Sequence, residues 1–149
     1  MAKVFIGYDT YGVKGVDEEF VHFIFDMVLA HTASSPDSEV GLVVTSDEHI
    51  RALNHQYRGK DRLTNVLSFA NDEIEGFISA ADDKGYLGDI YMSYPQLLRE
   101  AHTLSISSRE RFIQLFVHGA LHLLGFDHEE TQDAGTMEQL EEKIMSSIL

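Results

Sequence analysis

Three histidines near the C-terminal end of the chain have the spacing of a metal site. Residues 118–128 read HGALHLLGFDH, which places His118 and His122 four positions apart and His128 shortly after Gly125. Residues four apart on a helix share one face, and a glycine can end the helix and turn the chain back toward that face. Three imidazoles with an open fourth position are typical of catalytic zinc. We predict one Zn²⁺ per chain bound by His118, His122 and His128, although nickel or copper fits the same ligands.

The residues around these ligands indicate which reactions the predicted metal site could catalyse. The spacing H-x-x-x-H-x-x-G-x-x-H is that of the metzincin proteases, which have a glutamate directly after the first histidine. This chain has Gly119 there, so peptide hydrolysis by that mechanism is not expected. Asp127 precedes the third ligand and is a candidate catalytic residue, which would orient a histidine or take a proton from water. Its alternative role is to cap the turn, and we expect Glu129 and Glu130 to face solvent.

One basic segment stands out in an acidic chain. The 149 residues carry 11 Lys and Arg against 25 Asp and Glu, and a net charge of −14 argues against a non-specific nucleic-acid binder. Four of those 11 basic residues fall within residues 51–62, namely Arg51, Arg58, Lys60 and Arg62. Asp61 is the one acidic residue in this segment. Such a run is usually a solvated face. A local basic site is the alternative.

The segments that must position these residues alternate between strand and helix patterns. Helical spacing and capping residues predict helices over 17–33, 47–57, 94–104 and 108–124, and a final amphipathic helix that contains Met137, Leu140, Ile144 and Ile148. The helix over 108–124 is apolar nearly all round, which is typical of a buried central helix. Apolar runs predict strands over 3–8, 40–45, 64–70 and 86–93, and the lack of alternation in 64–70 suggests burial on both faces. A long polar loop is expected between 71 and 85.

These elements predict a single domain over residues 1–149. Its class is α+β, with a small mixed four-stranded sheet packed with about five helices and the zinc site at the end of the buried central helix. The hydrophobic content of 44% suits a globular core. The absence of cysteine excludes disulfides and thiolate metal ligands. The sequence contains no apolar stretch long enough for a membrane span or a signal peptide, so we expect a cytoplasmic protein.

Three blocks of the sequence resemble the YbeY family of bacterial endoribonucleases and ribosomal-RNA maturation factors. They are LNHQYRGKDRLTNVLSFA at 53–70, LGDIYMS at 87–93 and HGALHLLGFDHEE at 118–130. The resemblance is weaker over the first 45 residues and the last helix. The family usually has proline where this chain has Leu63 and Ala70, and often tyrosine where it has Phe126. Loss of the prolines predicts a less rigid backbone around the strand between them.

The resemblance implies a zinc-dependent endoribonuclease specific for single-stranded RNA. It implies a role in small-subunit ribosomal-RNA 3′ end processing and in ribosome quality control, with His118, His122 and His128 as zinc ligands and Arg58 in the active-site cleft. A guanidinium can bind phosphate through two parallel hydrogen bonds, and Lys60 and Arg62 would hold flanking phosphates. The expected partners are single-stranded or ribosomal RNA and the ribosome. Because the chain is acidic, we expect its binding to depend on a small-subunit ribosomal protein. Neither DNA nor a membrane is expected.

Two other functions stay open. One is a metallohydrolase that acts on peptides or small esters, against which Gly119 weighs. The other is a non-catalytic ribosome-assembly factor with a structural zinc, against which the open fourth position weighs. An assay for metal-dependent cleavage of single-stranded RNA, run beside an Arg58→Ala variant, distinguishes these two functions from that of an endoribonuclease.

Overall fold

The computed structural model describes residues 3–71, 85–126 and 131–149, which form four strands and five helices. In chain order these are β1 (Lys3–Tyr8), α1 (Glu18–His31), β2 (Glu39–Thr45), α2 (Asp47–Arg58), β3 (Val66–Ala70), β4 (Tyr86–Ser93), α3 (Tyr94–Leu104), α4 (Ser108–Leu123) and α5 (Thr131–Ile148). The predicted α+β class is confirmed. The expected loop over 71–85 falls almost entirely outside the described residues. None of the helices described is long and apolar enough to cross a membrane.

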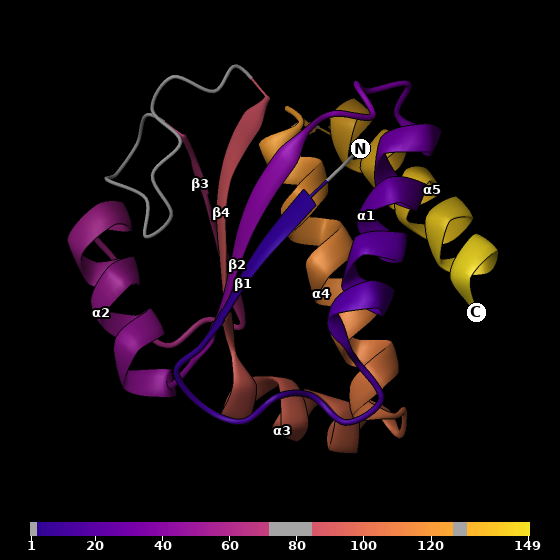
Figure 1. The fold of residues 1–149 in the computed structure, drawn as a ribbon. Helices are drawn as coiled ribbons and strands as arrows, with labels where there is room; N and C mark the ends of the chain where they lie inside the picture. The colour runs from indigo at the N-terminus through magenta and orange to yellow at the C-terminus, as the bar shows by residue number, and fades with distance from the viewer. Residues whose placement is uncertain (1–2, 72–84, 127–130) are drawn as a thin grey trace.

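The four strands form one mixed sheet with the order β1-β2-β4-β3. β1, β2 and β4 are parallel, and β3 runs antiparallel to β4 at the edge, with Ser68 opposite Ile90. Helices α1, α4 and α5 lie to one side of the sheet and α2 lies on the other (Figure 1). The prediction that residues 64–70 are buried on both faces was wrong. In β3 only Phe69 is fully buried, because an edge strand is covered incompletely by its neighbours.

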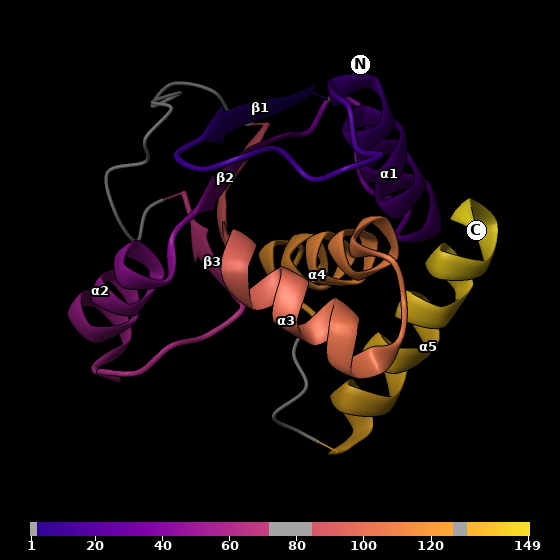
Figure 2. The same cartoon turned by 90° about the horizontal axis from the view of Figure 1, so that it is seen from below.

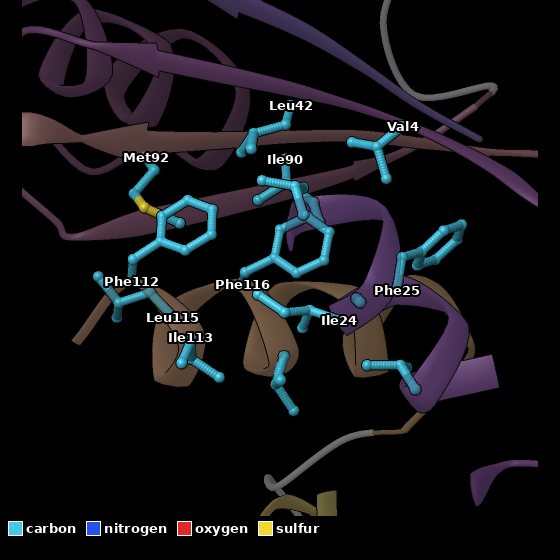
Figure 3. Packing of buried hydrophobic residues seen from close by; sticks show 14 of the residues in the cluster. Val4, Ile24, Phe25, Leu42, Ile90, Met92, Phe112, Ile113, Leu115 and Phe116 are labelled. Carbon is cyan, nitrogen blue, oxygen red and sulfur yellow. The ribbon is translucent and has the colours of Figure 1, made fainter. Parts of the chain in front are cut away.

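The main core lies between the sheet and helices α1 and α4. Leu42 and Ile90 project from the sheet toward Phe116 of α4, and Phe25 of α1 approaches the same ring edge-on with a centroid distance of 6.3 Å (Figure 3). Full burial of such side chains contributes about 1.5–3 kcal/mol each. Helix α4 contacts β3, β4, α1, α3 and α5, so the prediction of a central helix is confirmed. Figure 2 shows α4 enclosed between α3, α1 and α5.

The ends of the helices that carry the candidate site residues are set by local sequence. The Ser46 side chain accepts a hydrogen bond from the backbone of the first turn of α2, and Ser107 does the same for α4. Gly59, with φ of 70°, ends α2 directly after Arg58, and Gly125, with φ of 97°, follows α4. These caps agree with the sequence predictions and place the last turns of α2 and α4 near β3.

Candidate metal centre and basic groove

A polar stripe runs along helix α4, which is otherwise buried between Phe112 and Leu121. Its members are Arg111, Gln114, His118 and His122, all half-buried, at the three- and four-residue spacing of one helical face. The expectation of a helix that is apolar nearly all round is therefore corrected at this face. Apolar neighbours on the other faces fix the rotation of α4 and aim both imidazoles away from the core.

The two histidines on α4 face one another through the same ring atom. The Nε2 atoms of His118 and His122 are 3.0 Å apart, and their rings are nearly perpendicular, at 82°. Two nitrogens bound to tetrahedral zinc at about 2.0–2.1 Å would be separated by about 3.3 Å. The pair predicted from the i, i+4 spacing is therefore brought together in a geometry close to that of two metal ligands.

The other predicted members of this centre are not covered by the structure. His128, the third ligand, and Asp127, the candidate catalytic residue, lie outside the described residues. Glu129 and Glu130 lie outside them as well. Among residues 3–71, 85–126 and 131–149, no group of three or more candidate ligands forms. The three-histidine site thus stays a prediction of which the structure places two members.

A groove of about 830 Å³ opens beside the histidine pair. Its lining includes Arg58, Lys60 and Arg62 from the end of α2 and the following loop, together with His118 and His122. Apart from the imidazoles, every titratable side chain that the structure describes in this lining is basic. The basic segment is therefore more than a solvated face, because it shares one concave surface with the metal candidates.

Arg51, the fourth basic residue of that segment, points elsewhere. It forms an exposed ion pair with Asp61, with an N–O distance of 2.9 Å, and it does not line the groove. This pairing also engages the one acid within the basic segment. The positive character of the groove therefore rests on the other three cations.

Arg58 is held at the groove wall by β3. Its Nη2 atom donates a hydrogen bond of 2.8 Å to the backbone carbonyl of Ser68. Its guanidinium lies 4.6 Å from the ring centroid of the buried Phe69, a cation–π distance. Tyr57 also meets this ring edge-on and is 38% exposed, so it is not a core residue. These contacts join the end of α2 to the strand that borders the histidines.

Gly119 lies on the face of α4 that packs against the sheet. A Cβ atom there would come within 3.0 Å of the Ile90 side chain and 3.1 Å of Ser68 Oγ. Ser68 Oγ also donates a hydrogen bond of 3.0 Å to the Gly119 carbonyl. The structure thus explains why this position lacks the protease glutamate: a side chain here would meet β3 and β4.

A second polar cluster, which sequence reasoning missed, supports the groove. Glu100 of α3 accepts hydrogen bonds from Arg111 at 2.7 Å and from Asn65 at 3.1 Å, and Gln96 adds another. Burial alone would raise the pKa of Glu100, but these hydrogen bonds outweigh it and hold the pKa below its usual value. Asn65 lines the groove, so the cluster fixes one part of its wall.

A buried Tyr–carboxylate pair lies on β4, with its aspartate in the second block of the sequence and its tyrosine directly before that block. The hydroxyl of Tyr86 donates a hydrogen bond to the carboxylate of Asp89, and burial followed by this contact raises the pKa of Tyr86. Both side chains occupy the space beside Gly41 on the neighbouring strand β2, where a Cβ atom would overlap them. A glycine at position 41 is therefore required by close approach.

An acidic hollow of about 700 Å³ adjoins the basic groove. It is bordered by carboxylates of α4 and α5, namely Glu110, Glu138, Glu141 and Glu142. The two hollows share Asn65, Val66 and His118. Within it, Glu141 Oε1 lies 3.3 Å from Nδ1 of His118. The first histidine of the pair therefore separates a positive surface from a negative one.

Comparison with known proteins identifies this combination of fold and site. A sequence model of the family described as Endoribonuclease YbeY matches residues 12–149. The chain belongs to the YbeY family. The Endoribonuclease YbeY of Desulforamulus reducens is 39% identical over 130 residues, which cover 87% of this chain and 85% of the relative. That of Chloroflexus aurantiacus is 41% identical over 132 residues, covering 87% and 86%, and that of a Sulfurihydrogenibium species is 34% identical over 147 residues, covering 98% and 92%.

The YbeY fold is also similar to a solved structure. The solution structure of TM1509 from Thermotoga maritima aligns with a TM-score of 0.61 and 25% sequence identity, over 99% of this chain and 89% of that one. The family model and the curated relatives confirm the resemblance seen in the three sequence blocks. The YbeY match also extends well beyond those blocks, over the N-terminal part and the last helix.

Proposed function

We propose that this protein is a zinc-dependent endoribonuclease that cleaves single-stranded RNA in ribosomal-RNA maturation. Membership of the YbeY family, whose curated relatives are named endoribonucleases, supports cleavage of RNA phosphodiester bonds. The observation that carries the proposal is the single groove that joins His118 and His122 to Arg58, Lys60 and Arg62. Imidazoles suited to a metal beside cations suited to phosphate are what hydrolysis of a polyanion requires.

The donor set of the groove fits zinc. The Nε2 atoms of His118 and His122 lie 3.0 Å apart, and neutral imidazole is a preferred zinc ligand. His118 and His122 would hold the ion together with the predicted ligand His128. When bound, the ion supplies Lewis acidity and lowers the pKa of a coordinated water to about 7. This chemistry also suits a site in which Gly119 leaves no room for a glutamate base.

Arg58 is the residue we assign to the scissile phosphate. A guanidinium is a rigid, planar cationic donor, and the hydrogen bond of Arg58 to the Ser68 carbonyl keeps it at the groove wall. Negative charge that develops on the phosphoryl oxygens would be stabilised by such a preorganised donor. Lys60 and Arg62 line the same groove and would contact neighbouring phosphates. Asp127 is kept as a proposed proton acceptor.

The size and surroundings of the groove favour a flexible strand. A volume of about 830 Å³ falls in the range of about 300–1,000 Å³ of ligand pockets, which suits a few splayed nucleotides better than a rigid duplex. The rest of the chain is strongly acidic, with a net charge of −14. Outside the groove, this charge would repel RNA, so productive binding is confined to strands that reach the cations.

We further propose that the cellular substrate is the 3′ end of small-subunit ribosomal RNA, with a role in ribosome quality control in the cytoplasm. The sequence resemblance in the three blocks supports this assignment. An acidic protein that must act on a ribosome also suits contact with a basic small-subunit ribosomal protein.

The test combines metal content with substrate preference. Elemental analysis of the purified protein should find about one zinc per chain, and chelation should abolish cleavage of single-stranded RNA until zinc is restored. A duplex of the same sequence should be cut much more slowly. Protein that contains no metal and takes up none on titration would contradict the zinc proposal. Equal cleavage of strand and duplex would contradict the proposed substrate.

A further inference from the structure

The two ring nitrogens of His118 face different groups. Nε2 points to the Nε2 atom of His122 at 3.0 Å, and Nδ1 lies 3.3 Å from Oε1 of Glu141. The side chains of His118 and Glu141 are each 29% exposed, so this contact is partly shielded from water. It joins α4 to α5 across 23 residues of sequence.

A histidine that binds a metal through one nitrogen usually donates the N–H of the other to a carboxylate or carbonyl. Such a partner selects the tautomer, fixes the ring plane and makes the ligating nitrogen a better donor. With Glu141 accepting from Nδ1, the neutral ring of His118 carries its proton there and presents the lone pair of Nε2 toward His122. This is the state in which His118 can bind zinc.

We propose that Glu141 is a positioning residue for the metal centre, which holds His118 in its ligating tautomer and orientation. This inference rests on the proposed zinc site and adds α5 to it. The three sequence blocks end before this last helix, and no motif pointed to Glu141.

The packing of α5 explains why this carboxylate reaches the histidine. Met137 and Ile144 are fully buried against the core, and Leu140 is half-buried beside them. Glu141 follows Leu140 at the border of this buried face and is itself half-buried, whereas Glu138 and Glu142 are exposed. All three glutamates border the acidic hollow. Glu138 and Glu142 therefore offer matched controls that change the local charge equally.

The experiment measures zinc affinity by competition with a chromophoric chelator in wild-type protein and in Glu141→Ala, Glu141→Gln, Glu138→Gln and Glu142→Gln variants. Loss of a carboxylate partner of a ligating histidine typically weakens metal binding about 10–100-fold, and we expect this for Glu141→Ala. Glu141→Gln keeps an acceptor oxygen without the charge, so its loss should be smaller. The two control variants should bind zinc within about twofold of wild type.

A second readout excludes a merely structural ion pair between α4 and α5. Long-range ¹H–¹⁵N correlation spectra of the metal-free protein report which ring nitrogen of His118 carries the proton. The wild type should show the Nδ1–H tautomer, and Glu141→Ala should shift the population toward Nε2–H. A structural pair would instead lower Tm with unchanged zinc affinity and tautomer, and that result would overturn the proposal.

The outcomes also separate this proposal from the proposed function. If wild-type protein takes up no zinc, the metal site itself is wrong. If the wild type binds zinc and Glu141→Ala binds it as tightly as the control variants do, the site stands and the positioning role of Glu141 is refuted.

Discussion

Replacement of Arg58 by alanine should separate activity from stability. Among its contacts, the side chain donates a hydrogen bond to the Ser68 carbonyl and lies over the ring of Phe69. Loss of these contacts should cost about 1–2 kcal/mol, which for a chain of this size lowers Tm by about 2–8 °C. Loss of a preorganised donor to the transition state should lower the rate of RNA cleavage by about 10²–10³, or about 2.7–4 kcal/mol. The folded protein should therefore survive with little activity.

The assay is single-turnover cleavage of a fluorescent single-stranded RNA with zinc-loaded enzyme in excess. Arg51→Ala is the matched control, because Arg51 lies on the same helix and carries the same charge but pairs with Asp61 outside the groove. Loss of that exposed pair should cost about 0–1 kcal/mol and leave the rate within a few-fold of wild type. Arg58→Lys keeps the charge without the bidentate fork, so its rate should fall between those of Arg58→Ala and wild type.

Two results would refute this reasoning. If Arg58→Ala and Arg51→Ala slow cleavage equally, the effect comes from net charge and Arg58 has no specific role. If Arg58→Ala loses activity only in proportion to a loss of folded protein, measured by circular dichroism at the assay temperature, its role is to attach α2 to β3.

Three further changes test other parts of the structure. Glu100→Gln should lower stability by about 1.5–3 kcal/mol. Because the pKa of Glu100 is lowered on folding, its carboxylate stabilises the wild type fully above about pH 4.3, and this stabilisation is lost as the pH falls through the folded pKa. Urea unfolding of the variant should therefore depend less on pH in that range than unfolding of the wild type. Gly119→Glu should cost more than about 3 kcal/mol, because a carboxylate would be forced between Ile90 and Ser68, and digestion of a peptide library should show no protease activity. Gly41→Ala should destabilise by about 1–3 kcal/mol through overlap with the buried Asp89, which chemical denaturation would measure; an unchanged midpoint in any of the three would contradict the packing described.

The elements that sequence predicted well are those that local chemistry determines. Ser46 and Ser107 begin helices at the expected places, and Gly59 ends α2, because capping depends on residues within one turn. The pairing of His118 with His122 followed from helical periodicity in the same way. Helix α4 was recognised as central because its apolar residues leave no wide polar face.

The features that sequence did not predict depend on contacts between distant segments. Residues 64–70 have an apolar pattern, but their place at the sheet edge follows from pairing with β4, which is later in the chain. The Glu100 cluster joins α3 to α4 and to the segment before β3. Glu141 reaches His118 only because α5 packs against α4. Acidic residues are common in this chain, so nothing in the local sequence distinguishes these two carboxylates.

The boundary between the basic groove and the acidic hollow gives the site a direction. The charged side chains that line the two hollows change from basic, on the side of Arg58, to mainly acidic, on the side of Glu138 and Glu142, and His118 lines both. An extended polyanion that lies in the groove is therefore attracted on one side of the histidine pair and repelled on the other. A strand that crosses the histidine pair is therefore held mainly by the phosphates on its cationic side, whichever of its two ends lies there.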